Sequence, residues 1–311
     1  MAHRDGNTHE FGDLFPKGPE VERLATGFLF TEGPIWHPLG QYLLFSDMPG
    51  DVRRRWAPGD EAREARRPSN KCNGMTYDAR LDLVVCEHAT SRVTVESGDS
   101  SRVVASHFDG KELNSPNDVI CAADGSIYFT DPVYGRMPGF GIERDQELDF
   151  QGVYRVDPAG DLHLEVADFA APNGLCLSPD GLHMYVNDSE RALIRIFDIG
   201  ADGTLTNDRV FFPDIGSGDL AEGVPDGMKV DAGGNVYVTG PGGIWVISPT
   251  ARYLGRIEVP EVVGNMNWGG HDWRTLFICA STSLYSIQTQ IPGAASPYML
   301  AGNDSEESLD G

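Results

Sequence analysis

The sequence predicts an all-β fold, a six-bladed β-propeller closed by an N-terminal strand. A short polar head followed by short strand-like runs recurs along the chain, and successive heads lie roughly 39 to 56 residues apart, the period of a propeller blade. The six heads are Glu32, Asn73, Asn117, Asn173, Asp226 and Asn265. No stretch sustains a helical hydrophobic periodicity, so few helices are expected. Units of about four antiparallel strands then close into one ring.

The repeats leave a segment outside the ring at each end of the chain. Residues 1–20 carry Gly, Pro and charges without periodicity and are expected to form an N-terminal arm. Residues 21–296 carry the propeller, and 297–311 form a C-terminal tail whose end, 303–308, is expected to fray. The sixth unit shows only three strong strands, so the alternating run 20–27 is expected to donate the fourth and close the last sheet edge.

Within each unit the apolar runs are short and are separated by turns rich in Gly, Pro and Asp. In the first three units these runs cover 34–37, 42–46, 51–56, 74–77, 81–86, 92–95, 118–121, 126–130 and 152–156. In the last three they cover 174–177, 183–186, 193–197, 229–231, 235–239, 275–279 and 283–287. Insertions are expected at 131–151 and 207–222, and an insertion as long as the first often covers a pocket.

Composition limits the partners of the protein. Its 311 residues include 47 Asp and Glu against 24 Lys and Arg, and this acidity repels phosphate backbones, so no nucleic-acid partner is expected. The five cysteines form no CxxC pair and lie in apolar runs, which predicts buried free thiols in a reducing compartment. No signal-peptide core or membrane-length apolar run is present. We expect a cytoplasmic protein without a membrane partner, of open oligomeric state.

The heads carry the functional prediction, because the residue before each innermost strand of a propeller lies at one mouth of the central channel. Acids and amides occupy all six positions, without Lys or Arg. Their hard oxygens suit Ca²⁺, which takes roughly six to eight oxygen ligands, better than Zn²⁺, which prefers imidazole or thiolate. Two carboxylates close together on a dry axis would repel each other without a cation. The ring of heads therefore predicts a cation site.

A second interpretation of the same residues is structural. Asn-Gly and Asp-Gly pairs favour hairpin turns, so Asn73, Asn173 and Asp226 could be plain turn residues. Residues such as Asp124 are of this kind, because they lie between two strands of one blade. The heads instead fall between blades, and Glu32 is a poor turn residue. As a set they favour the cation site.

Further candidates lie near the heads. Tyr134 and Arg136 open the long insertion and could contact a substrate. His88 and His271 could reach the channel, although isolated histidines are more often packed or on the surface. Trp268 follows the sixth head and is a candidate for the pocket wall or for the core. The sequence holds no GxSxG, HExxH or Walker motif.

Six segments in fixed order carry a family resemblance: 31–36, 114–119 followed by 124–132, 172–175 with 178–181, and 224–228. Together they resemble the senescence marker protein/gluconolactonase/luciferin-regenerating enzyme family, closest to its bacterial gluconolactonases. The resemblance extends from about residue 20 to about residue 290. It implies a six-bladed propeller with one divalent ion near the axis, usually Ca²⁺, with Mg²⁺, Mn²⁺ or Zn²⁺ as replacements.

Carried onto this chain, the resemblance implies that the metal ligands are Glu32, Asn117, Asn173 and Asp226. Animal members of the family carry an Arg at the position of Ser115, and that Arg helps to hold substrate. Contacts to a sugar must therefore differ in this chain.

The leading hypothesis is a metal-dependent lactonase, a carboxylic ester hydrolase that opens a small lactone such as glucono-1,5-lactone. The cation would stabilise the oxyanion that forms when water attacks. Asp226 would deprotonate the water or only orient it, and Glu32 would mainly hold the ion. Asn73, Asn117 and Tyr134 would bind sugar hydroxyls, and Trp268 is the further candidate for substrate contact.

Two alternatives stay open. The same site would serve aromatic lactones or phosphotriesters if Trp36, Trp268 and Phe140, rather than polar groups, walled the channel mouth. A Ca²⁺-binding propeller without catalytic activity would instead show a broad exposed apolar patch.

Overall fold

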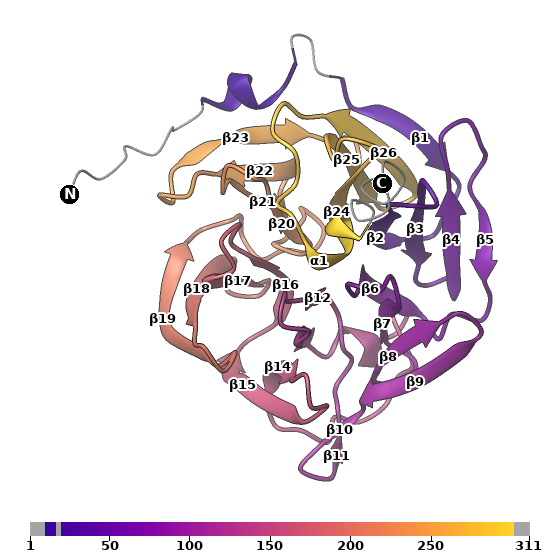
Figure 1. Ribbon diagram of the computed structural model, residues 1–311, viewed down its shortest axis with the longest axis vertical. Helices are drawn as coiled ribbons and strands as arrows, with labels where there is room; N and C mark the ends of the chain where they lie inside the picture. The colour runs from indigo at the N-terminus through magenta and orange to yellow at the C-terminus, as the bar shows by residue number, and fades with distance from the viewer. Residues whose placement is uncertain (1–9, 17–19, 302–311) are drawn as a thin grey trace, which may run out of the picture.

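The computed structural model describes residues 10–16 and 20–301, and these form six four-stranded antiparallel sheets around a central axis (Figure 1). The predicted six-bladed propeller is confirmed. In each blade the first strand lies nearest the axis and the last lies at the periphery. The innermost strands therefore all begin at the same end of the central channel.

The first three blades follow one another along the chain. Blade 1 contains β2 (Thr31–His37), β3 (Tyr42–Asp47), β4 (Val52–Trp56) and β5 (Arg63–Arg66). Blade 2 contains β6 (Cys72–Tyr77), β7 (Leu83–Glu87), β8 (Arg92–Ser97) and β9 (Ser100–Ala105). A short hairpin of β10 (His107–Phe108) and β11 (Lys111–Glu112) precedes blade 3, which contains β12 (Val119–Cys121), β13 (Ile127–Asp131), β14 (Gln151–Val156) and β15 (Leu162–Phe169).

The last three blades complete the ring. Blade 4 contains β16 (Pro172–Leu177), β17 (His183–Asp188), β18 (Leu193–Ile199) and β19 (Leu205–Phe212). Blade 5 contains β20 (Met228–Val230), β21 (Val236–Gly240), β22 (Gly243–Ile247) and β23 (Tyr253–Glu258). Blade 6 contains β24 (Val263–Gly269), β25 (Thr275–Ala280), β26 (Ser283–Gln288) and β1 (Glu22–Thr26). The insertion expected at 207–222 is therefore shorter than predicted, because its first residues complete β19.

The N-terminal strand closes the ring, as predicted. Strand β1 pairs antiparallel with β26, with Glu22 opposite Ser286 and Thr26 opposite Ser283. The last blade thus combines three C-terminal strands with one N-terminal strand (Figure 1). This pairing covers the edge of β26 that would otherwise stay unpaired.

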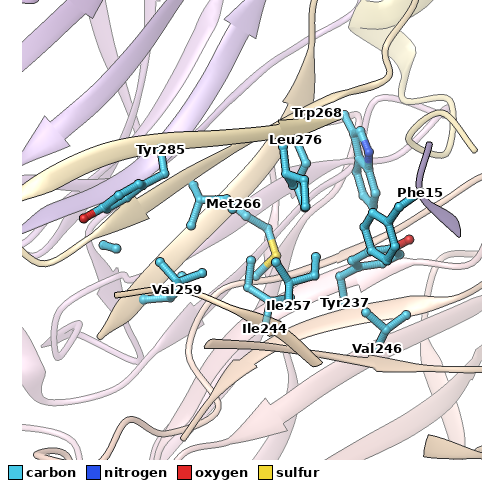
Figure 2. Close-up of a cluster of buried hydrophobic side chains, with 14 of the residues drawn as sticks. Phe15, Tyr237, Ile244, Val246, Ile257, Val259, Met266, Trp268, Leu276 and Tyr285 are labelled. Atoms are coloured by element: carbon cyan, nitrogen blue, oxygen red, sulfur yellow. The ribbon is translucent and has the colours of Figure 1, made fainter. Parts of the chain in front are cut away.

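Parts of both terminal segments pack on the propeller. Leu14 and Phe15, at the end of the 3₁₀ helix η1 (Phe11–Leu14), join the buried cluster that blades 5 and 6 form (Figure 2). Tyr298 and Met299, in the short helix α1 (Pro297–Leu300), pack against the cluster of blades 1 and 2. The segments expected as an arm and a tail therefore contact the ring where the structure describes them, and the expected frayed end at 303–308 lies outside the described residues.

The core consists of apolar clusters between neighbouring blades. In Figure 2, Tyr237, Ile244 and Val246 of blade 5 face Met266 and Leu276 of blade 6. All five cysteines are buried and free, as predicted. Within residues 10–16 and 20–301, no helix has the length and apolar character needed to cross a membrane.

Candidate active site

Five of the six heads meet at one cavity of about 110 Å³ at the start of the innermost strands. Its lining includes the side chains of Glu32, Asn73, Asn117, Asn173 and Asp226, one from each of five blades. The structure thus brings together all four residues expected as metal ligands and the amide of Asn73.

The sixth head, Asn265, supports this group from the side. Its Nδ2 donates to Glu32 Oε2 over 3.1 Å, and its Oδ1 accepts from the backbone N–H of Met266. Glu32 Oε2 also accepts from the N–H of Gly33 over 2.7 Å. One carboxylate oxygen of Glu32 is therefore held by two donors.

Irregular backbone aims the heads at the axis. The register of β2 against β3 shifts between Glu32 and Ile35, and β6 and β16 show the same shift at 72–75 and 172–175. A bulge of this kind changes the direction in which a side chain leaves the strand. The repeated bulge explains why heads that belong to strands still face the channel.

The glycine after four heads is required by close approach between blades. A Cβ on Gly174 would lie 2.1 Å from the carbonyl oxygen of Asp226, and one on Gly74 would lie 2.5 Å from that of Asn117. Neither glycine has a positive φ, so Asn73-Gly74 and Asn173-Gly174 are not the hairpin turns of the alternative interpretation. At Gly33 the added atom would again meet a carbonyl oxygen, that of Asn73, and at Gly227 it would meet the side-chain amide of Asn265.

An acid at the end of the second strand fixes the loop before the head in three blades. Each carboxylate accepts the N–H groups of the two residues that stand three and two positions before a head. The pairs are Asp47 with Leu29 and Phe30, Asp131 with Asn114 and Ser115, and Asp188 with Ala170 and Ala171. This repeated hydrogen bonding sets the positions of Glu32, Asn117 and Asn173.

The two head carboxylates are electrostatically unfavourable without a cation. Burial is the main cause that raises the pKa of Glu32 to about 7. Burial and the nearby charge of Glu32 raise the pKa of Asp226 well above its ordinary value. Asp118, which is buried behind them, raises both pKa values further, and Lys229 lies 3.5 Å from its Oδ2. With all four side chains charged, three carboxylates and one ammonium carry a net charge of about −2, which one divalent cation would neutralise.

Amide oxygens at the cavity could contribute to holding such a cation. Asn73 Oδ1 and Asn173 Oδ1 are buried and have no hydrogen-bond partner among the described residues. A buried amide oxygen without a partner is costly; a bound cation would satisfy that of Asn173, and a hydroxyl of a bound substrate would satisfy that of Asn73. Within residues 10–16 and 20–301, no three His, Cys, Asp or Glu side chains gather around a possible metal position, so a ligand set here needs the amides. The residues present fit a hard divalent cation.

The walls of the cavity are mostly apolar. Phe30, Met48, Phe140, Leu220 and Val262 line the cavity together with the polar heads. Phe30 and Phe140 meet edge to face with their ring centroids 6.0 Å apart. A ligand would therefore meet both oxygens and hydrocarbon.

The long insertion at 131–151 contributes two residues to the lining of the cavity, in agreement with the expectation that it covers a pocket. Tyr134, which opens the 3₁₀ helix η2 (Tyr134–Arg136), and Phe140 both line the cavity. Burial raises the pKa of Tyr134 to about 12, so its hydroxyl stays protonated and can donate a hydrogen bond. The hydroxyl also contacts Ser189.

Two residues near this insertion, one a candidate substrate contact and one at the position of a substrate-binding Arg in animal relatives, have structural roles. The buried guanidinium of Arg136 donates to the carbonyls of Leu113 and Asn114 and to Glu112, so it anchors the insertion rather than facing the cavity. Ser115 is fully buried, donates to the Pro132 carbonyl and accepts from the Gly135 N–H. Contacts to a ligand must come from other residues.

Trp268 lies away from the heads, so the structure does not support it as a substrate contact. It is buried in the core between blades 5 and 6, with its ring 4.9 Å from that of Tyr237, and its Nε1 donates to Thr289 (Figure 2). Strand β24 runs along the channel from Asn265, so Trp268, three residues later, lies farther from the heads. It lines a different cavity, of about 410 Å³, toward the opposite end. His271 is exposed and does not line the cavity of the heads.

His88 does reach the cavity, and Ser189 was missed from the sequence. His88 contacts Asn73, and burial lowers its pKa to about 4, so the imidazole is neutral near pH 7. Ser189 accepts from Asn173 Nδ2 over 3.1 Å. Both residues come directly after the second strand of their blades, β7 and β17. That shared register was the only sequence signal that could have identified Ser189.

Comparisons with known proteins agree with this architecture. The family model described as SMP-30/Gluconolactonase/LRE-like region matches residues 30–282. The chain is 33% identical to a gluconolactonase from Zymomonas mobilis over 295 residues, which covers 88% of this chain and 82% of the relative. The structure of a gluconolactonase from Xanthomonas campestris superposes with a TM-score of 0.82 and 30% identity, covering 91% of this chain and 93% of the other.

A more distant structure shows the fold alone. A calcium-binding regucalcin from Agrobacterium tumefaciens superposes with a TM-score of 0.74 at 17% identity, covering 91% of this chain and 97% of the other. The family model spans most of the propeller, and its extent agrees with the ordered motifs of the sequence. The protein therefore belongs to the SMP-30/gluconolactonase/LRE family.

Proposed function

We propose that this chain is a Ca²⁺-dependent lactonase that hydrolyses a small monocyclic sugar lactone such as glucono-1,5-lactone. The observation that carries the proposal is the group of oxygens from Glu32, Asn117, Asn173 and Asp226 at one cavity of about 110 Å³. Membership in a family that includes a gluconolactonase, at 33% identity, supports a lactone as the substrate class.

The same four residues would hold the metal ion. Bound there, Ca²⁺ would act as a Lewis acid that stabilises negative charge developing on a carbonyl oxygen. Asn265 keeps the Glu32 carboxylate in place from the neighbouring blade. Asn117 and Asn173 have their backbones fixed by the hydrogen bonds of Asp131 and Asp188 to the preceding loops.

The chemistry requires water to add to the carbonyl carbon and the ring C–O bond to break. Asp226 would orient the attacking water or take its proton; Ca²⁺ lowers the pKa of a carboxylate that it binds, so Asp226 would be a weak base acting on a reactive lactone. That proton passes to the alkoxide released from the ring, and the carboxylic acid product then ionises. Tyr134 donates to, and the amides of Asn73 and Asn117 accept from, substrate hydroxyls.

The apolar walls favour a second candidate substrate class. Phe140 lies at the mouth as the aromatic-substrate alternative requires, together with Phe30 and Met48, whereas Trp36 does not line this cavity. A lactone with an aromatic or alkyl flank would cover more of this wall than a fully hydroxylated ring. The volume of the cavity limits either class to one ring within it.

A proton-release assay tests both candidates. Purified protein is offered glucono-1,5-lactone, a smaller sugar lactone, an aromatic lactone and a chromogenic phosphotriester, each with Ca²⁺ and with chelator. We expect Ca²⁺-dependent opening of the sugar lactones. Faster turnover of the aromatic lactone would favour the second class, and no turnover of any lactone would contradict the proposal.

A further inference from the structure

Two amides that line the cavity have their Nδ2 groups bonded to neighbouring side chains. Asn73 directs Nδ2 toward His88 Nε2 over 3.1 Å, and Asn173 directs Nδ2 toward Ser189 Oγ over 3.1 Å while its amide also bonds the Asp226 carboxylate. As a consequence both Oδ1 atoms are buried without a partner. An amide has nearly the same shape when flipped, so the partner of Nδ2 decides whether oxygen or nitrogen faces the cavity.

We propose that His88 and Ser189 are positioning residues. They hold the two amides so that each Oδ1 faces the group that would bind there, a substrate hydroxyl at Asn73 and a cation at Asn173. This rests on the proposed function for the identity of those groups. The orientation itself depends only on contacts within the protein.

For His88 the insertion fixes the imidazole tautomer. Nδ1 lies 3.2 Å from the carbonyl oxygen of Phe140, which can only accept, so Nδ1 carries the proton. A neutral imidazole has one N–H, so Nε2 is an acceptor and selects the NH₂ group of Asn73. With the proton on Nε2 instead, the amide would flip and present NH₂ to the cavity.

The insertion holds this arrangement by direct contact. A Cβ on Gly135 would lie 2.6 Å from His88 Cγ, so the insertion backbone packs on the ring. The guanidinium of Arg144 bonds Glu112 over 3.1 Å, and that of Arg136 bonds the same carboxylate over 2.8 Å. The carbonyl that sets the tautomer therefore belongs to an anchored segment, and His88 is fully buried beneath it.

Ser189 acts in the same way in blade 4. Its hydroxyl donates to the carbonyl of Pro225 over 2.5 Å, so its lone pairs remain to accept from Asn173 Nδ2. Pro225 directly precedes Asp226. One hydroxyl thus couples the orientation of an amide ligand to the backbone of a carboxylate ligand in the next blade.

The tautomer can be read without substrate or metal. Nitrogen NMR of imidazole-labelled protein distinguishes a protonated from a bare ring nitrogen, and a His88→Gln spectrum identifies the His88 signals by their loss. We expect a neutral ring with the proton on Nδ1. A proton on Nε2 would overturn the assignment for His88.

Two substitutions separate the roles at the two amides. His88→Leu is expected to raise KM about tenfold, the cost of one uncharged hydrogen bond, with the Kd for Ca²⁺ changed less than about twofold. Ser189→Ala is expected to weaken Ca²⁺ binding, measured by calorimetry, about tenfold or more, as loss of an outer-shell partner of a metal ligand does. His88→Gln and Ser189→Thr keep the hydrogen-bonding groups and should restore most of each loss.

His163→Leu and Ser101→Ala change the same residue types on outer strands, and thermal melts show whether each variant folds. Folded His88→Leu with normal KM, or folded Ser189→Ala with normal Ca²⁺ affinity, would overturn the corresponding role. A wild-type protein that opens no lactone would contradict the proposed function, while the tautomer measurement would still decide the inference.

Discussion

At the scale of single residues, Glu32 and Asp226 illustrate how the site departs from the rules for a stable interior. Both carboxylates are held beside a third, Asp118, in surroundings that disfavour their charged forms. Sites of this kind persist because a ligand or a reaction compensates for the unfavourable charge.

Asp226→Asn and Glu32→Gln are each expected to lower kcat at least about 10²-fold, the size of losing a main electrostatic element of a site. In chelator, both variants should melt at or above the wild-type temperature, because one of two repelling buried charges is gone. Steady-state kinetics and thermal melts measure the two effects. Asp60→Asn, in an exposed outer turn, is the control. Near-normal turnover in both variants would reject the site.

At the scale of elements, the contact between adjacent innermost strands decides where the heads can lie. Gly174 faces the carbonyl of Asp226 at a distance that leaves no room for a methyl group. The N–H of Gly174 also donates to that carbonyl over 3.0 Å, and Asn187 donates to it from β17. Three contacts therefore fix the backbone of one head from the neighbouring blade.

Gly174→Ala tests this packing. The added methyl must push the β16 and β20 backbones apart, which should destabilise the protein by about 1–3 kcal/mol and weaken Ca²⁺ binding as well. Chemical denaturation and calorimetry provide the measurements. Gly12→Ala adds a methyl where nothing lies within 4 Å and should change neither quantity. Equal effects of the two substitutions would contradict the packing argument.

Asp188→Asn tests the repeated carboxylate that holds the loop before a head. An amide offers one acceptor oxygen where the carboxylate offers two, so a backbone N–H at 170 or 171 loses its partner. We expect a loss of about 1–3 kcal/mol in unfolding free energy and weaker Ca²⁺ binding through Asn173. Denaturation curves and Ca²⁺ titrations follow the change. The exposed neighbour Glu190, changed to Gln, should leave both unaffected.

At the scale of the whole molecule, the proposed ion would join blades that otherwise meet only through their sides. Its four expected ligands belong to blades 1, 3, 4 and 5. Ca²⁺ that binds only the folded ring should stabilise it by about 2.7 kcal/mol at a concentration of 100 times Kd. Thermal melts over a Ca²⁺ series with a chelator baseline check this expectation. A melting temperature independent of Ca²⁺ would argue against a cation on the axis.

The periodic part of this structure could be predicted from the sequence, and the irregular part could not. Heads at a regular interval located Glu32, Asn117, Asn173 and Asp226 at one mouth, because equivalent positions of a closed ring must converge. Repetition does not fix side-chain direction or depth, however. Asn265 therefore turns to Glu32 rather than to the cavity, and Trp268, a few residues further along the same strand, belongs to the core at the other end.

The contacts that the long insertion makes could not be predicted from the sequence either. Phe140 meets His88 across 52 positions of sequence, and no local pattern records such a contact. Ser189 shares only its register with His88. Periodicity predicts the position of a residue within its blade. Contacts with a segment that does not repeat can be found only from the structure.

The pairing of β1 with β26 also affects the order of events during synthesis. Strand β1 is synthesised early, but its partner β26 ends at Gln288. The propeller of the nascent chain therefore stays open until nearly the whole chain has been made. Glu32 belongs to blade 1 and Asn265 to blade 6, so the hydrogen bond between them forms only after the last blade has closed the ring. A ribosome-bound fragment that lacks the last blade should therefore hold no competent ion site, however well its earlier blades have folded.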